Sequence, residues 1–100
     1  KVSFCNEIAA LCQKLGVEYE TVGGLAAEDP RITPSHTHVP GPDGRRGFGG
    51  TCFPKDTHGL RVLCQQHGVP CPVLRAILQR NEDIDRPEHD WMQDKGRATL

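Results

Sequence analysis

The sequence predicts a small all-α domain of four or five short-to-medium helices with one long, ordered loop rich in glycine and proline. Apolar residues recur at spacings of three and four in several segments, which is typical of helices, and no segment shows the clean alternation of a strand. The length agrees, because a chain of 100 residues buries only roughly two-thirds of its unfolded surface, enough for a single modest core.

The first helix is expected at the very start of the chain. Apolar residues fall at offsets of three and four from Phe4 to Leu15, and Gly16 is placed to end the helix. Nothing precedes this pattern that could cap it, and the chain opens on Lys1, so we expect a piece of a longer protein. The helix is apolar on more than one face, which predicts burial on two sides in a symmetric homodimer. These apolar positions are Val2, Phe4, Cys5, Ile8, Ala9, Leu11 and Cys12.

A weaker helix and a long loop are expected next. Residues 17–27 have helical character, although Gly23 and Gly24 lower the helix propensity there. Periodicity then disappears from residue 28 to residue 51, where prolines and glycines accumulate. Ordered loops of this length in a compact domain are usually functional, so we expect this loop to be ordered over one end of the domain.

Three further helices are predicted in the second half of the chain. Asp56 is placed to cap a helix that Gly68 ends. The apolar spacing of residues 73–81 predicts another helix, and Pro87 fits the first turn of a last short helix around Trp91.

Composition and charge exclude several classes of protein. With 12 Lys and Arg against 13 Asp and Glu, the net charge is -1, unlike the basic stripe of a nucleic-acid module. No apolar run has the length of a membrane span, and the first residues do not resemble a signal peptide. Five cysteines, an odd count, favour reduced thiols, so we expect no nucleic acid, no membrane and a cytoplasmic location.

The residues best suited to chemistry lie together from Gly47 to Asp56, in the string Gly-Phe-Gly-Gly-Thr-Cys-Phe-Pro-Lys-Asp. Cys52 ends a glycine-rich loop and begins a helix, where main-chain N–H groups, the helix dipole and Lys55 would stabilise a thiolate. Asp56 follows one helical turn later and could accept a proton or orient water. The glycines leave room for a ligand near the main chain. Such a set suits covalent chemistry at a carbonyl carbon.

The other cysteines have simpler interpretations. Cys5, Cys12 and Cys64 fall on apolar helix faces, where a thiol usually acts as a small buried hydrophobe. Cys71 lies between two prolines and gives no clear indication. From spacing alone, a catalytic role and a structural role both stay open for Cys52.

Two kinds of ligand site are not indicated. No Cys-x-x-Cys pair occurs, and the His36-x-His38 pair has no second pair to match it, so no metal is expected. Gly47-x-Gly49 is not a dinucleotide fingerprint, because Cys52 occupies the third glycine position and no strand precedes it.

Four segments, in order, resemble the central, dimer-forming domain of the UDP-glucose/GDP-mannose dehydrogenase family. They are Phe-Cys-Asn-Glu-Ile-Ala-Ala-Leu-Cys from Phe4, Gly16-Val17, Asp-Pro-Arg-Ile from Asp29, and above all the ten-residue string from Gly47. The resemblance runs from Lys1 to about Asn81. The ten-residue string is its most specific part.

The resemblance implies a reaction and a role for each matching residue. These enzymes oxidise the C6 alcohol of a UDP- or GDP-sugar to a carboxylate with two hydride transfers to NAD. Cys52 would be the nucleophile that carries thiohemiacetal and thioester intermediates, and Asp56 would assist water and protons. Arg31 would reach the nucleotide sugar, typically across a dimer interface. The residues that line the substrate pocket would be Gly47, Phe48 and Gly49. The residues that border the NAD site would be Cys52, Phe53, Pro54 and Lys55.

The resemblance also implies what residues 1–100 leave out. They would form the central dimerisation and substrate-binding domain, truncated at its N-terminus, without the Rossmann NAD domain or the C-terminal nucleotide-binding domain. The family's catalytic Lys-x-x-x-Asn motif would precede Lys1. Without those parts, such a chain is expected to behave as a dimerisation module with no catalysis of its own, which is the alternative to the enzyme interpretation. A metal-binding module is a third and more distant alternative. The sequence does not select among nucleotide sugars.

Overall fold

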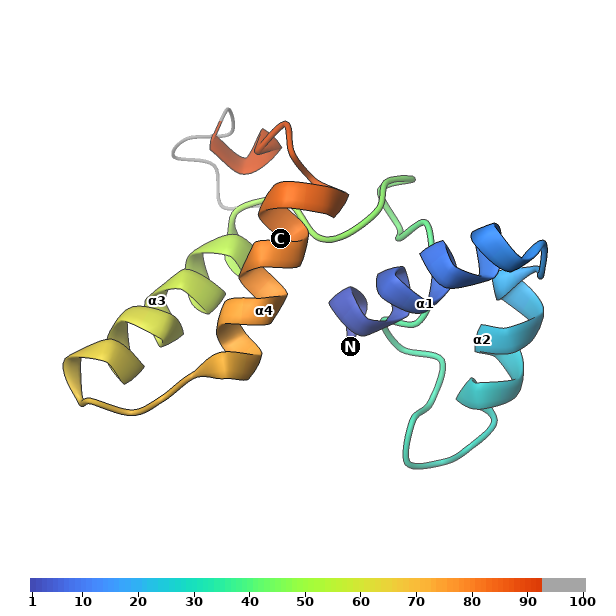
Figure 1. The fold of residues 1–100 in the computed structure, drawn as a ribbon, viewed down its shortest axis with the longest axis horizontal. Helices are drawn as coiled ribbons and strands as arrows, with labels where there is room; N and C mark the ends of the chain where they lie inside the picture. Colours follow the sequence, from blue (N-terminus) through green and yellow to red (C-terminus); the bar gives the residue numbers. More distant parts are fainter. Residues whose placement is uncertain (93–100) are drawn as a thin grey trace. The chain divides into compact units, whose positions relative to one another are not determined.

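The computed structural model describes residues 1–92 and confirms the all-α fold class, with no strand in that range. Figure 1 shows the order of the elements. The chain forms two compact units, one spanning Lys1–Gly47 and the other beginning at Phe48. No helix among the described residues is long and apolar enough to cross a membrane. The helices are α1 (Val2–Leu15), α2 (Tyr19–Ala27), α3 (Cys52–Gln66) and α4 (Pro72–Arg80), followed by a π-helical turn (Asn81–Asp85) and a 3-10 turn (Asp90–Met92).

Helix α1 ends where the sequence predicts. Gly16 has a φ of 71°, in the left-handed region that glycine tolerates best, and its N–H donates to main-chain carbonyls of the last turn. The buried side of the helix, by contrast, differs from the predicted apolar face. It consists of Ser3, Asn6, Ala9 and Cys12.

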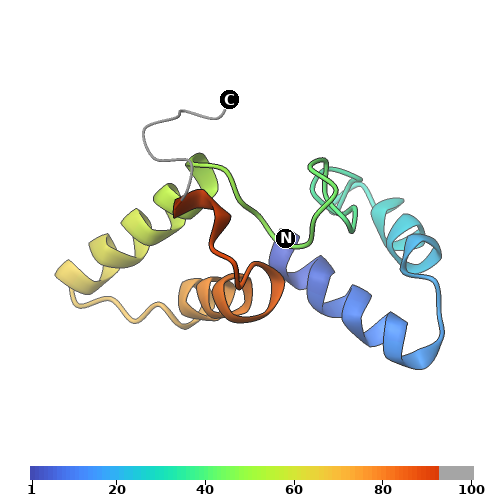
Figure 2. The same ribbon diagram turned by 90° about the horizontal axis from the view of Figure 1, so that it is seen from above.

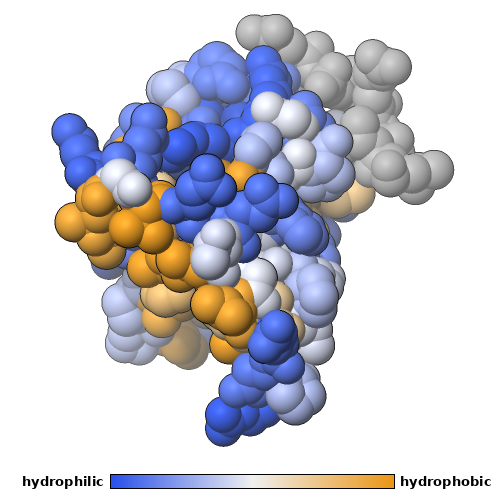
Figure 3. Space-filling view, turned by 90° about the vertical axis from the view of Figure 1, so that its right-hand side faces the viewer, coloured by the Kyte–Doolittle hydropathy of each residue, from blue (hydrophilic) through white to orange (hydrophobic). Residues whose placement is uncertain are grey.

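The larger apolar residues of α1 lie on its exposed side. Phe4 is 66% exposed and Leu15 is 68% exposed, and Leu11 lies between them on the same stripe. Helix α1 contacts α2 within this unit, and its buried face carries the smaller side chains. Periodicity therefore identified the helix, whereas the size of the side chains decides which face packs in the monomer. Figure 3 shows apolar side chains gathered at the surface beside hydrophilic ones.

Helix α2 and the long loop are joined through Tyr19. The ring of Tyr19 covers Gly23, where an added Cβ would lie 2.9 Å from the ring Cζ. The Tyr19 hydroxyl donates a 2.6 Å hydrogen bond to the carbonyl of Thr37 in the loop. Gly23 is thus needed for packing, which explains a glycine inside a helix.

The second unit is built on α3 and α4, which contact each other and lie side by side (Figure 2). The prediction that Asp56 caps this helix is wrong, because α3 begins four residues earlier, with Thr51 as N-cap. Pro54 lies in the first turn, where no intrahelical N–H is required. Helix α4 has the predicted extent, with Pro72 at its start.

The end of the described chain departs from a simple last helix. The chain forms a π-helical turn directly after α4, and Pro87 precedes the 3-10 turn instead of lying in its first turn. The interior here is largely polar. Asn81 and Arg86 are each only 1% exposed, and the apolar residues buried beside them in the described part of this unit include Leu78 and Phe48.

Candidate functional site

The loop before Cys52 uses its glycines in two different ways. Gly47 and Gly50 have φ values of 65° and 76°, which side chains rarely adopt. Gly49 is needed for space, because an added Cβ would lie 2.0 Å from Nη1 of Arg86 and 2.6 Å from Oδ2 of Asp90. The group that approaches the main chain at Gly49 is therefore a guanidinium of the same chain.

Asn81 binds both the N–H and the carbonyl of Phe48. Its Oδ1 accepts a 2.9 Å hydrogen bond from the Phe48 N–H, and its Nδ2 donates a 2.9 Å bond to the Phe48 carbonyl. Both bonds are buried, so water does not compete for them. The side chain of Asn81 thus satisfies both main-chain polar groups of this buried residue.

A second buried asparagine performs a related task within the first unit. Oδ1 of Asn6, a residue 2% exposed, accepts a 3.1 Å hydrogen bond from the N–H of Gly47. Its Nδ2 donates to the carbonyl of Val2, one turn earlier in α1. Gly47 is therefore held to α1 by a side chain, as Phe48 is held by Asn81.

The predicted catalytic side chains lie at the start of α3. Cys52 is the first residue of the helix and is exposed. Asp56 lies one turn later on the same face, and its Oδ1 is 3.4 Å from Nζ of Lys55, with both side chains well exposed. Phe53 packs edge-to-face against Phe48 at a ring separation of 5.8 Å.

The other cysteines differ from Cys52 in exposure. Cys12 is buried, as predicted from its helix face, whereas Cys5, Cys64 and Cys71 are half-buried. The five cysteines form no disulfide within the described residues. Among residues 1–92, no group of three or more His, Cys, Asp or Glu could hold a metal ion.

Arg31, the predicted substrate arginine, belongs to the first unit, whereas Cys52 belongs to the second. Its side chain is fixed by Asp29, with Nε–Oδ1 and Nη2–Oδ2 distances of 3.1 and 2.8 Å. The hydrogen bond from the Arg31 side chain holds the pKa of the Asp29 carboxyl below its usual value. The guanidinium is thus oriented while remaining exposed.

The residues that hold the loop were missed by sequence reasoning. Asn81, Arg86 and Asp90 lie in a polar run that looks solvated in the sequence. One signal was available, because Asn81 continues the apolar stripe of Leu74 and Leu78 at helical spacing. A polar residue on such a stripe is buried only if its hydrogen bonds are satisfied, as those of Asn81 are.

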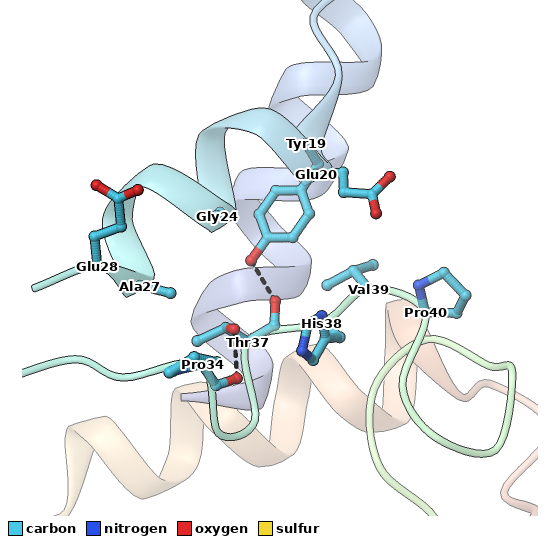
Figure 4. Close-up of a pocket in the computed structure, with 11 residues that line it drawn as sticks. Tyr19, Glu20, Gly24, Ala27, Glu28, Pro34, Thr37, His38, Val39 and Pro40 are labelled. Atoms are coloured by element: carbon cyan, nitrogen blue, oxygen red, sulfur yellow. Dashed lines mark hydrogen bonds between the residues drawn. The ribbon is translucent and has the colours of Figure 1, made fainter.

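A separate cavity of about 660 Å³ lies in the first unit between α2 and the long loop (Figure 4). Tyr19 points into it toward Thr37, and Glu20 and Glu28 lie at its rim. None of the predicted site residues lines this cavity.

Comparison with known proteins identifies the family of this chain. The model of the UDP-glucose/GDP-mannose dehydrogenase family, central domain, matches residues 1–83. The chain therefore belongs to the UDP-glucose/GDP-mannose dehydrogenase family.

Individual relatives agree with this assignment. Over 82 residues the chain is 38% identical to a UDP-glucose 6-dehydrogenase of Rickettsia felis, which covers 82% of this chain and 17% of the relative. Over 81 residues it is 41% identical to a UDP-glucose 6-dehydrogenase of Pseudomonas aeruginosa, covering 81% of this chain and 17% of the relative. The chain thus spans less than a fifth of the length of these relatives. No solved structure matches it.

Proposed function

We propose that this chain is the central, substrate-binding and dimer-forming domain of a cytoplasmic NAD-dependent nucleotide-sugar 6-dehydrogenase. One observation carries the proposal. Cys52, in the most specific motif of the chain, is exposed at the first position of α3, directly after a glycine loop fixed by buried hydrogen bonds. A thiolate is best stabilised at that end of a helix.

The chemistry follows from a thiol placed in this way. Oxidation of the C6 alcohol gives an aldehyde, and addition of the Cys52 sulfur to C6 forms a C–S bond and a thiohemiacetal. Loss of a hydride and a proton then gives a thioester. Water attacks the thioester carbonyl, the C–S bond breaks, and the products are the carboxylate and the Cys52 thiol. Asp56, one turn from Cys52, is positioned to accept the proton of that water.

The chain supplies one wall of an NAD site at most. NAD, when bound, accepts the two hydrides. The exposed faces of Cys52, Phe53 and Lys55 can border it, and Pro54 shapes the buried side of the same turn. The described residues contain no strand, so a phosphate loop between strand and helix does not occur among them.

Arg31 and the exposed stripe of α1 support the substrate and partner parts of the proposal. The Arg31 guanidinium, oriented by Asp29, suits a phosphate of the nucleotide sugar. Phe4, Leu11 and Leu15 form an exposed apolar stripe that a second copy of the chain would cover. We expect a homodimer, which sedimentation at micromolar concentration measures. A monomer there, unaffected by Leu11→Asp, contradicts this part of the proposal.

The alternative is a dimerisation module with no catalysis of its own, which the same α1 stripe favours. The 100-residue chain alone is expected to form no NADH from UDP-glucose and NAD. The discriminating experiment replaces the matching 82-residue segment of the Rickettsia felis enzyme by that of this chain. The chimera should form NADH, its Cys52→Ser form should not, and an active Cys52→Ser chimera would reject Cys52 as nucleophile.

A further inference from the structure

The π-helical turn after α4 brings two buried side chains to consecutive residues of the loop before Cys52. The N–H of Arg86 donates a 2.7 Å hydrogen bond to the carbonyl of Asn81, which closes this turn. The Asn81 side chain pairs with Phe48, and the Arg86 guanidinium lies against Gly49. Single π turns occur often at functional sites because they re-aim side chains.

We propose that Asn81, together with Arg86, is a positioning residue that sets the direction of the chain from Phe48 into α3 and thereby the position of Cys52. The proposal rests on the proposed function only in taking Cys52 as the reacting group.

The contacts determine the direction of the loop, beyond holding it in place. A single hydrogen bond would leave one of the two peptide planes that flank Phe48 able to rotate, but bonds to both its N–H and its carbonyl hold both planes. Arg86, held by a 2.8 Å bond from its Nη1 to Asp90, fills the space beside Gly49. Only Gly49, Gly50 and Thr51 separate Phe48 from Cys52, so the start of α3 follows from the orientation of these two planes.

The same contacts predict a specific effect on reactivity. The helix N-terminus stabilises a thiolate only when the first turn of α3 is formed and aligned. If the peptide planes that flank Phe48 rotate, the first turn of α3 should lose its alignment and Cys52 its exposed place at the start of that helix. Cys64, near the end of α3, and Cys71, at the start of α4, should be unaffected.

The test uses the 100-residue chain with Asn81→Asp, which keeps the acceptor oxygen but loses the donor, and Asn81→Leu, which loses both. Gln79→Glu, the same amide-to-acid change at an exposed position on α4, is the matched control. Brief iodoacetamide treatment and mass spectrometry give the alkylation rates of Cys52, Cys64 and Cys71. Hydrogen exchange at the Phe48 N–H reports the contact itself.

Each Asn81 variant should alkylate Cys52 about fivefold more slowly than the unchanged chain, with Cys64 and Cys71 within about twofold. Gln79→Glu should leave all three rates unchanged. If all three cysteines are alkylated faster by the same factor, for example because both variants unfold, then Asn81 only holds the unit together. That result would overturn the proposal. An unchanged or faster Cys52 would also overturn the proposal. Alkylation needs neither nucleotide sugar nor NAD, so this result is independent of the chimera assay.

Discussion

The peptide that leads into Cys52 and the side chains that follow it have opposite environments. Before Cys52, Phe48 is buried, its N–H and its carbonyl are both bonded to Asn81, and Gly49 packs against a buried arginine. After it, the side chains of Lys55 and Asp56 are 73% and 67% exposed. Contacts within the second unit thus order the main chain before Cys52, while the side chains expected to take part in the reaction are exposed to solvent.

In the second unit, the residues that order the loop are therefore different from the residues that are available for chemistry. Buried polar contacts are costly unless satisfied, so they define one geometry for the loop. Exposed side chains contribute little to stability and are available to a substrate, a cofactor or another part of the protein. Changes before Cys52 should therefore affect stability, and changes after it should affect chemistry.

One of the two largest effects on stability is expected at Gly49. Gly49→Ala places a Cβ 2.0 Å from the Arg86 guanidinium, and overpacking of this kind costs about 3 kcal/mol. Gly59→Ala is the control, since Gly59 lies in α3 with open space around it, and should stabilise by about 0.8 kcal/mol. Urea unfolding followed by circular dichroism measures both. Equal effects of the two changes would contradict the packing at Gly49.

A second contrast compares buried and exposed carboxylates. The Asp85 side chain is 1% exposed and lies 3.2 Å from Nε of Arg80. Asp85→Ala should lower the free energy of unfolding by about 3 kcal/mol, because it leaves a largely buried arginine without this partner. Asp56→Asn should change it by less than about 0.5 kcal/mol and, in the chimera, reduce the rate of NADH formation. A large loss of stability from Asp56→Asn would contradict the difference between the buried and the exposed carboxylate.

The sequence predicted the helices better than their packing. The extent of α4 and the end of α1 at Gly16 followed from periodicity and end signals. The buried face of α1 did not, because a single sequence shows where apolar residues recur but not whether a partner covers them. The motif from Gly47 to Asp56 was evident, whereas Asn81 and Arg86, which hold it, lie more than thirty residues from Phe48 in a run that looks solvated.

The smallest effect concerns Asp29 and Arg31, in the first unit. The hydrogen bond from Arg31 lowers the pKa of Asp29 from its usual 3.8, so the ion pair stabilises the fold fully above that pH. The contribution is lost as pH falls through the lowered pKa. Acidification from about pH 5 to about pH 2 should release the Arg31 side chain, seen by NMR as a change in the chemical shift of its Nε–H. The shift should move toward the value found in Asp29→Asn, where it should stay the same at both pH values. A shift that moves equally in that variant would contradict the pairing.

The central claim is that the ordered loop presents Cys52, alone among the five cysteines, as an open group at a helix N-terminus. Brief iodoacetamide treatment of the unchanged chain at two pH values, followed by mass-spectrometric mapping, tests it most directly. Cys52 should be alkylated first at both pH values, Cys71 more slowly, and Cys12 only when the fold opens. A protected Cys52, or one no faster than Cys71 at the lower pH, would contradict the claim that the loop presents Cys52 as the open cysteine.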